Sequence, residues 1–149
     1  MFTALVTPFR DDALDEAALR DLVERQVEAG VDGIVPCGST GEAATLSYAE
    51  HRRVVEVCVE AAGGRVQVLA GTGSNSTRES IELTRHARDA GADGALLISP
   101  YYNKPTQEGV VAHYAAVARE SGLPLVAYNI PGRTASNILP ETMARIAEI

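Results

Sequence analysis

The sequence lacks several features that would assign it to whole classes of protein. It has 13 lysine and arginine residues against 20 aspartate and glutamate residues, a net charge of -7 and an isoelectric point near 4.9. That balance offers no basic surface for nucleic acid or anionic membranes. No apolar run approaches the ~20 residues that span a bilayer. Nucleic acid and membranes are therefore excluded as expected partners, and the composition, 46% hydrophobic and 22% charged, is typical of a globular domain.

Cysteine is scarce as well. Cys37 and Cys58 are the only two, which is too few for a disulfide framework, and they lack the paired spacing of a zinc site. The N-terminal residues carry no basic stretch, and their apolar segment is too short for a secretion signal. We therefore expect a cytoplasmic protein in a reducing environment.

Length and lysine content set two further limits. The 149 residues are too few for a complete (β/α)₈ barrel, which needs about 250. The chain also ends inside a helical pattern without a closing loop, so we expect residues 1–149 to be an incomplete domain. The only lysine, Lys104, lies in a polar loop. An exposed amine is mostly protonated at neutral pH and is a poor nucleophile, so Lys104 is not expected to react with carbonyl groups.

Short apolar runs alternate regularly with longer segments of helical period. Strands are predicted for Thr3–Thr7, Gly33–Cys37, Val66–Ala70, Gly94–Ser99 and Leu125–Asn129. Because these runs are apolar on both faces, they are expected to be parallel strands buried on both sides. Segments such as Glu16–Ala29 repeat apolar residues along one helical face. The pattern predicts an α/β fold of five consecutive βα units, with helices outside a parallel sheet.

Five βα units fit either a doubly wound sheet or part of a barrel, and periodicity does not choose between them. Ser47 with Glu50, and Ser76 with Glu79, have the spacing of reciprocal helix caps. In both folds chemistry gathers where strands end and βα loops begin. The loops expected to hold the site are 38–46, 71–76, 100–109 and 130–137.

The loop Gly38-Ser39-Thr40-Gly41-Glu42 places two hydroxyls between glycines, where a ligand can approach the backbone closely. It fits either a carboxylate or phosphate site or a plain tight turn. It is not a P-loop, because no lysine follows the second glycine, and the segment 71–76 lacks the third glycine of a dinucleotide fingerprint. Nucleotide binding is therefore not predicted.

Tyrosines and an arginine follow the fourth and fifth predicted strands. Tyr101 and Tyr102 come after the fourth, and Tyr128 and Arg133 after the fifth. A guanidinium can hold a carboxylate with two hydrogen bonds. A single phenol, with an ordinary pKa of about 10, moves protons poorly at neutral pH, so a chain of tyrosine, threonine and serine hydroxyls is expected to share that task. The alternative is that Tyr128 closes the core and Arg133 is a solvated loop residue.

Other residues with reactive side chains are expected to have structural roles. His51, His86 and His113 fall in helical segments, at positions expected to be exposed or half-buried. Cys37 is expected to fill apolar space rather than act as a nucleophile. Glu42 is expected to accept hydrogen bonds from loop amides.

Three motifs resemble the dihydrodipicolinate synthase (4-hydroxy-tetrahydrodipicolinate synthase) family in order and spacing. They are Gly38-Ser39-Thr40-Gly41-Glu42, Tyr101-Tyr102-Asn103 and Tyr128-Asn129-Ile130-Pro131-Gly132-Arg133-Thr134. The resemblance runs from the first predicted strand to the last residue. Related pyruvate aldolases, such as N-acetylneuraminate lyase and the keto-sugar-acid aldolases, share the glycine loop and the tyrosine, whereas Arg133 favours the synthase. The resemblance implies a TIM-barrel fold of the class I aldolase type, of which residues 1–149 would be the N-terminal portion, with about five of eight βα units.

The resemblance also implies an activity. The family condenses pyruvate, held as a Schiff base on a lysine, with aspartate semialdehyde in lysine and diaminopimelate biosynthesis, without metal or organic cofactor, as a homotetramer. By position, Thr40, Ser39 and Tyr128 would form the proton relay, completed by Tyr102 from a neighbouring subunit. Thr40 and Gly41 would bind the pyruvate carboxylate, and Arg133 would bind that of the semialdehyde. The Schiff-base lysine would lie beyond the last residue of this chain.

Some family members are inhibited by lysine at a site between subunits. The matching positions here hold His51, Asn75, Glu79 and Tyr101, whereas Tyr48 stands where lysine-sensitive relatives often carry histidine. These residues fit either a lysine site or ordinary helix-start and interface positions. The alternative to an enzyme is a non-catalytic half-barrel that exposes its sheet edges and associates to cover them.

Overall fold

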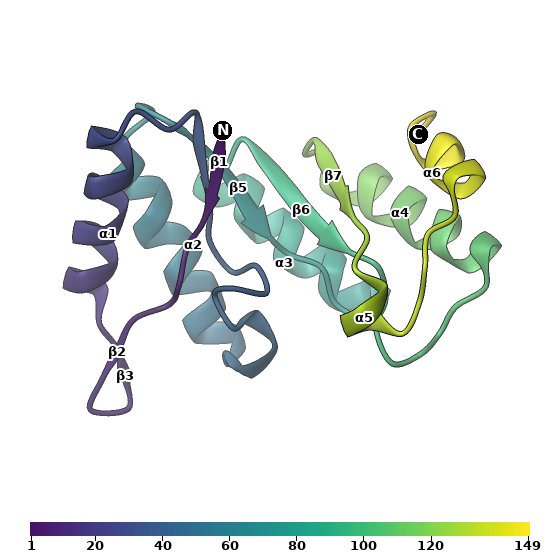
Figure 1. The fold of residues 1–149 in the computed structure, drawn as a ribbon, viewed down its shortest axis with the longest axis horizontal. Helices are drawn as coiled ribbons and strands as arrows, with labels where there is room; N and C mark the ends of the chain where they lie inside the picture. Colours follow the sequence, from purple (N-terminus) through teal and green to yellow (C-terminus); the bar gives the residue numbers. More distant parts are fainter.

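A five-stranded parallel sheet forms the centre of the computed structural model, which describes residues 1–149 (Figure 1). Its strands, in their order across the sheet, are β1 (Phe2–Ala4), β4 (Gly33–Val35), β5 (Gln67–Gly71), β6 (Gly94–Ile98) and β7 (Leu125–Tyr128). Each pairs in parallel with the next, as where Ile34 of β4 stands opposite Val68 of β5. The strand order therefore follows the chain without reversal.

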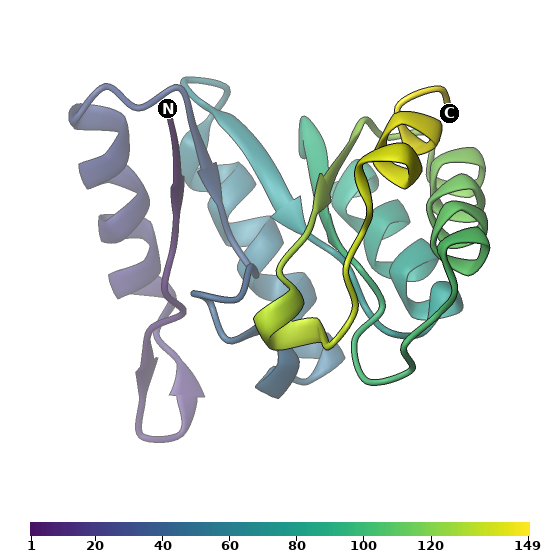
Figure 2. The same cartoon turned by 45° about the vertical axis from the view of Figure 1, so that its right-hand side comes forward.

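Helices alternate with the strands of the sheet, two more follow the last strand, and neighbouring helices pack side by side (Figures 1 and 2). They are α1 (Glu16–Glu28), α2 (Tyr48–Ala62), α3 (Thr77–Ala90), α4 (Gln107–Ser121), the short α5 (Pro131–Thr134) and α6 (Pro140–Ile146). Contacts join α1 to α2, α2 to α3, α3 to α4 and α4 to α6. None of these helices is both long and apolar enough to cross a membrane.

The strand order decides between the two folds that the sequence leaves open. A doubly wound sheet reverses its order at a switch point, which places helices on both faces. In this chain each strand joins beside its predecessor, and right-handed crossovers then place all the helices on one side. The fold is therefore of the (β/α) TIM-barrel type, with five of the eight strands of a complete barrel.

The five predicted strands are confirmed, with their ends displaced by a few residues. An antiparallel hairpin of β2 (Phe9–Arg10) and β3 (Ala13–Leu14) was not predicted. Its turn residues, Asp11 and Asp12, have φ angles of 50° and 61°. Two consecutive positive φ angles are typical of the type I′ turns that close two-residue hairpin loops. Figure 2 shows this hairpin extending beyond the end of β1.

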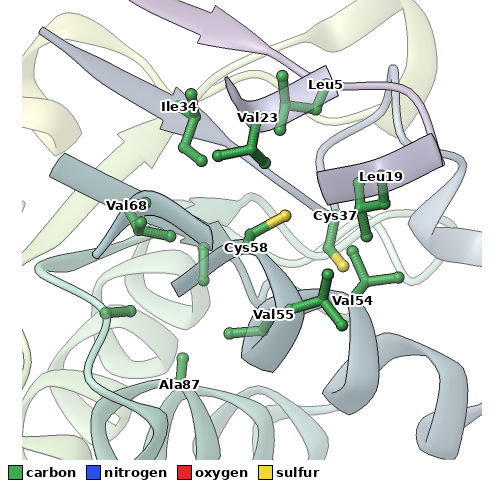
Figure 3. Packing of buried hydrophobic residues seen from close by; sticks show 14 of the residues in the cluster. Leu5, Leu19, Val23, Ile34, Cys37, Val54, Val55, Cys58, Val68 and Ala87 are labelled. Atoms are coloured by element: carbon green, nitrogen blue, oxygen red, sulfur yellow. The ribbon is translucent and has the colours of Figure 1, made fainter. Parts of the chain in front are cut away.

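The main hydrophobic core lies between the first strands and helices α1 and α2 (Figure 3). Its 17 buried residues include Leu5 and Ile34 on the sheet side and Val23 and Val55 on the helices. Burying a side chain of this size contributes about 1.5–3 kcal/mol. A smaller buried cluster holds β6 against α4 and consists of Leu97, Val110, Tyr114, Val117 and Ile138. Together the two clusters fix the strand ends where the loops begin.

One of the two predicted reciprocal caps forms. The Ser47 hydroxyl accepts a hydrogen bond from the Glu50 N–H, and the Glu50 carboxylate accepts one from the Ser47 N–H, at 2.8 Å. At α3, Ser76 caps the Glu79 N–H, but the Glu79 carboxylate accepts from the Ser74 hydroxyl at 2.6 Å instead. The prediction of a reciprocal cap there is wrong because the Ser76 N–H donates to the Ser74 hydroxyl oxygen at 3.1 Å, and Ser74 in turn binds the carboxylate.

The strands at the two edges of the sheet, β1 and β7, each pair with one neighbour only. Phe2 of β1 is 45% exposed and Val126 of β7 is 46% exposed. Beside β7, helices α4 and α6 border an apolar groove of about 410 Å³, with Met143 and Ile146 in its wall. Apolar surface is therefore incompletely covered at the β7 edge.

Candidate functional site

One pocket of about 520 Å³ lies at the carboxyl ends of β4 to β7. We call it the strand-end pocket. It is lined by the predicted site residues Ser39, Tyr128 and Arg133, and by three of the four at the predicted regulatory positions, His51, Glu79 and Tyr101. Thr40, Gly41, Tyr102 and Asn75 are not among its lining residues.

The glycine loop from Gly38 to Glu42 forms one side of this pocket. The Gly41 N–H donates to the Gly38 carbonyl at 3.1 Å, and the Glu42 N–H donates to the Ser39 carbonyl at 3.3 Å. The N–H groups of Gly38, Ser39 and Thr40 donate to no acceptor in the chain. A loop that presents successive free N–H groups can bind an anion such as a carboxylate. The observed loop is thus a candidate anion site rather than only a tight turn.

Both ends of the glycine loop adopt a left-handed backbone that non-glycine residues rarely take. The φ angle is 54° at Cys37 and 55° at Glu42. Such a conformation costs roughly 1–2 kcal/mol for each L-residue. Strain of this kind persists only where surrounding contacts enforce it, and it is concentrated at binding sites.

The start of the loop is held by close contact between β4 and β5. The Gly71 N–H donates to the Pro36 carbonyl at 2.9 Å. A Cβ atom at residue 71 would lie 2.1 Å from the Cys37 carbonyl oxygen, so only glycine fits there. His51 Nε2 lies 2.8 Å from the Gly71 carbonyl and closes the same contact from α2.

Two histidines are more deeply buried than predicted. His51 is 5% exposed and His113 is 4% exposed, so the expected exposed or half-buried positions are wrong for both. The reason is helical spacing: His51 shares the buried face of α2 with Val54 and Cys58, and His113 shares that of α4 with Val110. His86 is half-buried, as predicted.

The contacts of His51 suit a structural role. Burial lowers the pKa of His51, so the neutral ring is favoured. Neutral Nε2–H then donates to the Gly71 carbonyl, and Nδ1 is left without a partner. His51 therefore positions the end of β5 beside the pocket.

Tyr128 and Arg133 reach the pocket from the end of β7 and from α5. Tyr128 is half-buried, and its carbonyl accepts from the Ser99 N–H at 3.2 Å. Asn129 fixes the loop that follows, because its Oδ1 accepts from the Ile138 N–H at 3.0 Å. Arg133 is exposed and pairs with no carboxylate of the chain. Its guanidinium can therefore bind a carboxylate from solution.

The tyrosine pair after β6 divides between two environments. Tyr101 lines the pocket, whereas Tyr102 is 86% exposed, with a φ of 68°. The adjacent Asn103 is tied to the Asn75 carbonyl by a hydrogen bond of 2.7 Å. Within one copy of the chain, Tyr102 is therefore not part of the strand-end pocket.

Two carboxylates near the pocket differ in their contacts. Glu79 accepts from the Ser74 hydroxyl and lies beside the Tyr48 phenol, and these contacts hold its pKa below the usual value. Glu42 is exposed, and its side chain makes no hydrogen bond, so the prediction that it binds loop amides is wrong. Instead, Glu42 has a left-handed backbone, and its N–H closes the loop by donating to the Ser39 carbonyl.

The remaining candidate nucleophiles are poorly placed for chemistry. Cys37 is buried at the end of β4, and burial raises the pKa of its thiol, which agrees with the predicted filling role. Lys104 is exposed in the loop before α4 and does not line the strand-end pocket.

One polar residue at a strand end, Thr7, was not predicted to belong to the site. Thr7 follows β1, and its hydroxyl donates to the Gly41 carbonyl at 2.7 Å. A polar residue after the first strand was the available signal, since the same rule drew attention to the other strand ends.

Comparison with known proteins identifies close relatives over the whole chain. The model of the dihydrodipicolinate synthetase family matches residues 1–149. The 4-hydroxy-tetrahydrodipicolinate synthase of Geotalea uraniireducens is 63% identical over 145 residues, which are 97% of this chain and 50% of the relative.

Solved structures agree. That of the 4-hydroxy-tetrahydrodipicolinate synthase from Methylacidiphilum fumariolicum SolV matches with a TM-score of 0.97 at 48% identity, over 99% of this chain and 49% of that one. The chloride-inhibited dihydrodipicolinate synthase from Acinetobacter baumannii, complexed with pyruvate, matches with a TM-score of 0.97 at 51% identity, over 99% of this chain and 51% of that one. The chain thus spans about half the length of the relatives that it matches.

Proposed function

The chain belongs to the dihydrodipicolinate synthetase family, and from this premise we propose that it supplies the carboxylate-binding loop and the proton relay of a 4-hydroxy-tetrahydrodipicolinate synthase. That enzyme would condense pyruvate with aspartate semialdehyde in the cytoplasm, for lysine and diaminopimelate biosynthesis. Residues 1–149 would be the N-terminal portion of its barrel. The observation that carries the proposal is the glycine loop, in which Gly38 and Ser39 have free N–H groups and line the same pocket as Tyr128 and Arg133.

The glycine loop is proposed to hold the pyruvate carboxylate. The free N–H groups of Ser39 and Thr40 are suited to carboxylate oxygens, because hydrogen bonds to an ionised acceptor are about twice as strong as neutral ones. Gly41 is the most buried residue of the loop, and it has no side chain. The hydroxyls of Thr40 and Ser39 would then pass protons to Tyr128, which is the proposed acid and base.

Arg133 is proposed to hold the carboxylate of the second substrate. The guanidinium is exposed at the pocket wall and has no partner in the chain. Two parallel hydrogen bonds from a planar guanidinium to a carboxylate would fix the orientation of the aldehyde relative to pyruvate.

Tyr102 is proposed to complete the relay in a neighbouring copy. Its 86% exposure and its place outside the pocket suit a side chain that inserts across an interface. The bond between Asn103 and Asn75 would hold the loop ready for that contact. We therefore propose a homo-oligomer, with the tetramer of the family as its full form.

The Schiff-base lysine is proposed to come from the half of the relatives that this chain does not span. Lys104 is unsuited to the role, because it lies outside the pocket and is exposed. In the proposed reaction the protonated imine on the lysine acidifies the methyl group of pyruvate, and that carbon, after losing a proton, attacks the aldehyde carbon of the second substrate. No metal or organic cofactor is required.

The proposal is tested by trapping with pyruvate and borohydride. The 149-residue chain is treated alone and after mixing with a polypeptide spanning the remaining half of the Geotalea relative, and each polypeptide is weighed by intact mass spectrometry. We expect one pyruvate adduct on the added half and none on the chain, with synthase activity only in the mixture. Tyr128→Phe should abolish that activity, whereas Lys104→Arg should leave it unchanged. An adduct on the chain alone, or an inactive folded mixture, would contradict the proposal.

The same mixture separates the alternative functions. An N-acetylneuraminate lyase or a keto-sugar-acid aldolase would turn over a sugar aldehyde in place of aspartate semialdehyde. A non-catalytic half-barrel would bind small carboxylates through Thr40 and Arg133 and turn over neither aldehyde.

A second proposed role is lysine binding at His51, Glu79 and Tyr101, which line the pocket, and at Asn75, which lies outside it. The observation in its favour is the ionised Glu79 carboxylate on the pocket wall, which suits an ammonium group. Tyr48 competes for that carboxylate, so we expect weak binding. Calorimetric titration with lysine should show stronger binding by Tyr48→His than by the unmodified chain, and equal or weaker binding would contradict this role.

A further inference from the structure

We propose that Thr7 is a positioning residue that orients the free N–H of Thr40 through two peptide planes. The inference rests on the proposed carboxylate-binding role of the glycine loop. Thr7 lies just after β1, is 7% exposed and does not line the strand-end pocket. Its hydroxyl donates to the Gly41 carbonyl at 2.7 Å, across 34 residues of sequence.

The first plane is the peptide between Gly41 and Glu42. The atoms of a peptide unit are coplanar, so a hydrogen bond to the Gly41 carbonyl also directs the Glu42 N–H, which points the opposite way. That N–H donates to the Ser39 carbonyl at 3.3 Å. The Thr7 hydroxyl therefore fixes the direction of the Glu42 N–H, which is the donor to the Ser39 carbonyl.

The second plane is the peptide between Ser39 and Thr40. Its carbonyl is held by the Glu42 N–H, and its own N–H, on Thr40, donates to no group in the chain. Since the carbonyl and the N–H of one peptide unit point in opposite directions, holding the first aims the second. The Thr40 N–H is therefore directed by a hydroxyl that would not touch the ligand.

Contacts around Gly41 leave little freedom for another arrangement. A Cβ atom at Gly41 would lie 3.0 Å from the Leu5 carbonyl oxygen and 3.3 Å from the Thr7 hydroxyl oxygen. The other loop bonds, from the Gly41 and Ala43 N–H groups, both end at the Gly38 carbonyl and leave the Gly41 carbonyl to Thr7. A buried carbonyl without a donor is costly, so loss of the hydroxyl favours a flip of the peptide between Gly41 and Glu42.

The experiment compares Thr7→Val with Thr7→Ser, which keeps the hydroxyl. Thr84→Val is the control, because it removes another buried threonine hydroxyl, bonded to the Ser80 carbonyl and to the Thr72 hydroxyl and not to the glycine loop. Amide hydrogen exchange at Glu42 is measured by NMR without ligand, and pyruvate is then titrated while the Thr40 amide signal is followed. We expect Thr7→Val to exchange about tenfold faster at Glu42 and to bind pyruvate about tenfold more weakly, whereas Thr7→Ser and Thr84→Val stay within threefold of the unmodified chain.

The two readouts separate this inference from the proposed function. Unchanged exchange at Glu42 in Thr7→Val would overturn the positioning role, whatever the titration gives. Faster exchange at Glu42, with no pyruvate binding by the unmodified chain, would support the positioning role and contradict the carboxylate-binding role of the loop. If Thr7→Val does not fold, Thr7→Ala carries the same comparison, and failure of Thr7→Ser to restore slow exchange would also overturn the inference.

Discussion

The Nδ1 atom of His113 in α4 lies 2.9 Å from the hydroxyl oxygen of Thr77 at the start of α3. The other ring nitrogen, Nε2, is buried without a partner. Burial lowers the pKa of His113 from its ordinary 6.5 to about 4. The packing of these two helices therefore depends on a neutral imidazole.

This pair predicts that the fold is sensitive to acid. The unfolded chain binds the His113 proton near pH 6.5 and the folded chain only near pH 4, so stability is fully present above pH 6.5 and declines as the pH falls between these values. From pH 7 to pH 5 the free energy of unfolding should fall by about 2 kcal/mol on account of this residue. Urea unfolding of His113→Gln should show a smaller decline with pH, and His86→Gln is the matched control. Identical pH profiles for His113→Gln and the unmodified chain would contradict the prediction.

A second prediction concerns the contact between β4 and β5. Gly71→Ala should lower the free energy of unfolding by about 3 kcal/mol, because the new methyl group meets the Cys37 carbonyl, which is backbone and cannot turn aside. Gly132→Ala is the control, since a methyl group at residue 132 meets nothing within 4 Å. Thermal and urea unfolding measure both variants, and equal stability of the two would refute the clash.

A third prediction separates binding from stability at Arg133. Arg133→Gln removes an exposed side chain without an ion pair, so the free energy of unfolding should change by less than about 0.5 kcal/mol. In the mixture with the complementary half, kcat/KM for aspartate semialdehyde should fall about 10- to 100-fold, which corresponds to one charge-assisted pair. The KM for pyruvate should stay the same. An equally large rise in the KM for pyruvate would show that Arg133 also binds pyruvate and would contradict the prediction.

A fourth prediction follows from the open β7 edge. The isolated chain should bind an apolar dye and associate as its concentration rises, because an unpaired strand edge lies beside an apolar groove. Val126→Lys should reduce both effects in sedimentation velocity and dye titration, and Ala112→Lys on the exposed side of α4 should not. A chain that stays monomeric and binds no dye at any concentration would be evidence against it.

The element order and the site loops could be predicted because periodicity and strand-end position are local signals. The apolar run at Gly94–Ile98 and the helical face of α1 are each visible in a few residues. The hairpin was not predictable in the same way, since β2 and β3 have two residues each and leave no periodic trace. Its signal was the pair Asp11-Asp12, whose residue types tolerate a left-handed turn.

The parts of the site that escaped prediction depend on contacts between distant segments. His51 was expected at an exposed or half-buried position, yet it lies on the buried face of α2, where its ring contacts the Gly71 carbonyl of β5. Thr7 stands 34 residues from its acceptor, and no spacing rule joins them. The hydrogen bond from the Ser74 hydroxyl to the Glu79 carboxylate was not predicted, because the spacing of Ser76 and Glu79 indicated a reciprocal cap.

The order of the strands has a consequence for synthesis of the chain. Because β4, β5, β6 and β7 each pair with the strand that precedes them, every new βα unit finds its docking edge already made when it leaves the ribosome. Each strand therefore pairs soon after synthesis with a strand close to it in the chain, and among the early strands only β1 keeps one edge unpaired. Sheet growth in the direction of translation keeps loop closure short and limits the time for which apolar edges are exposed.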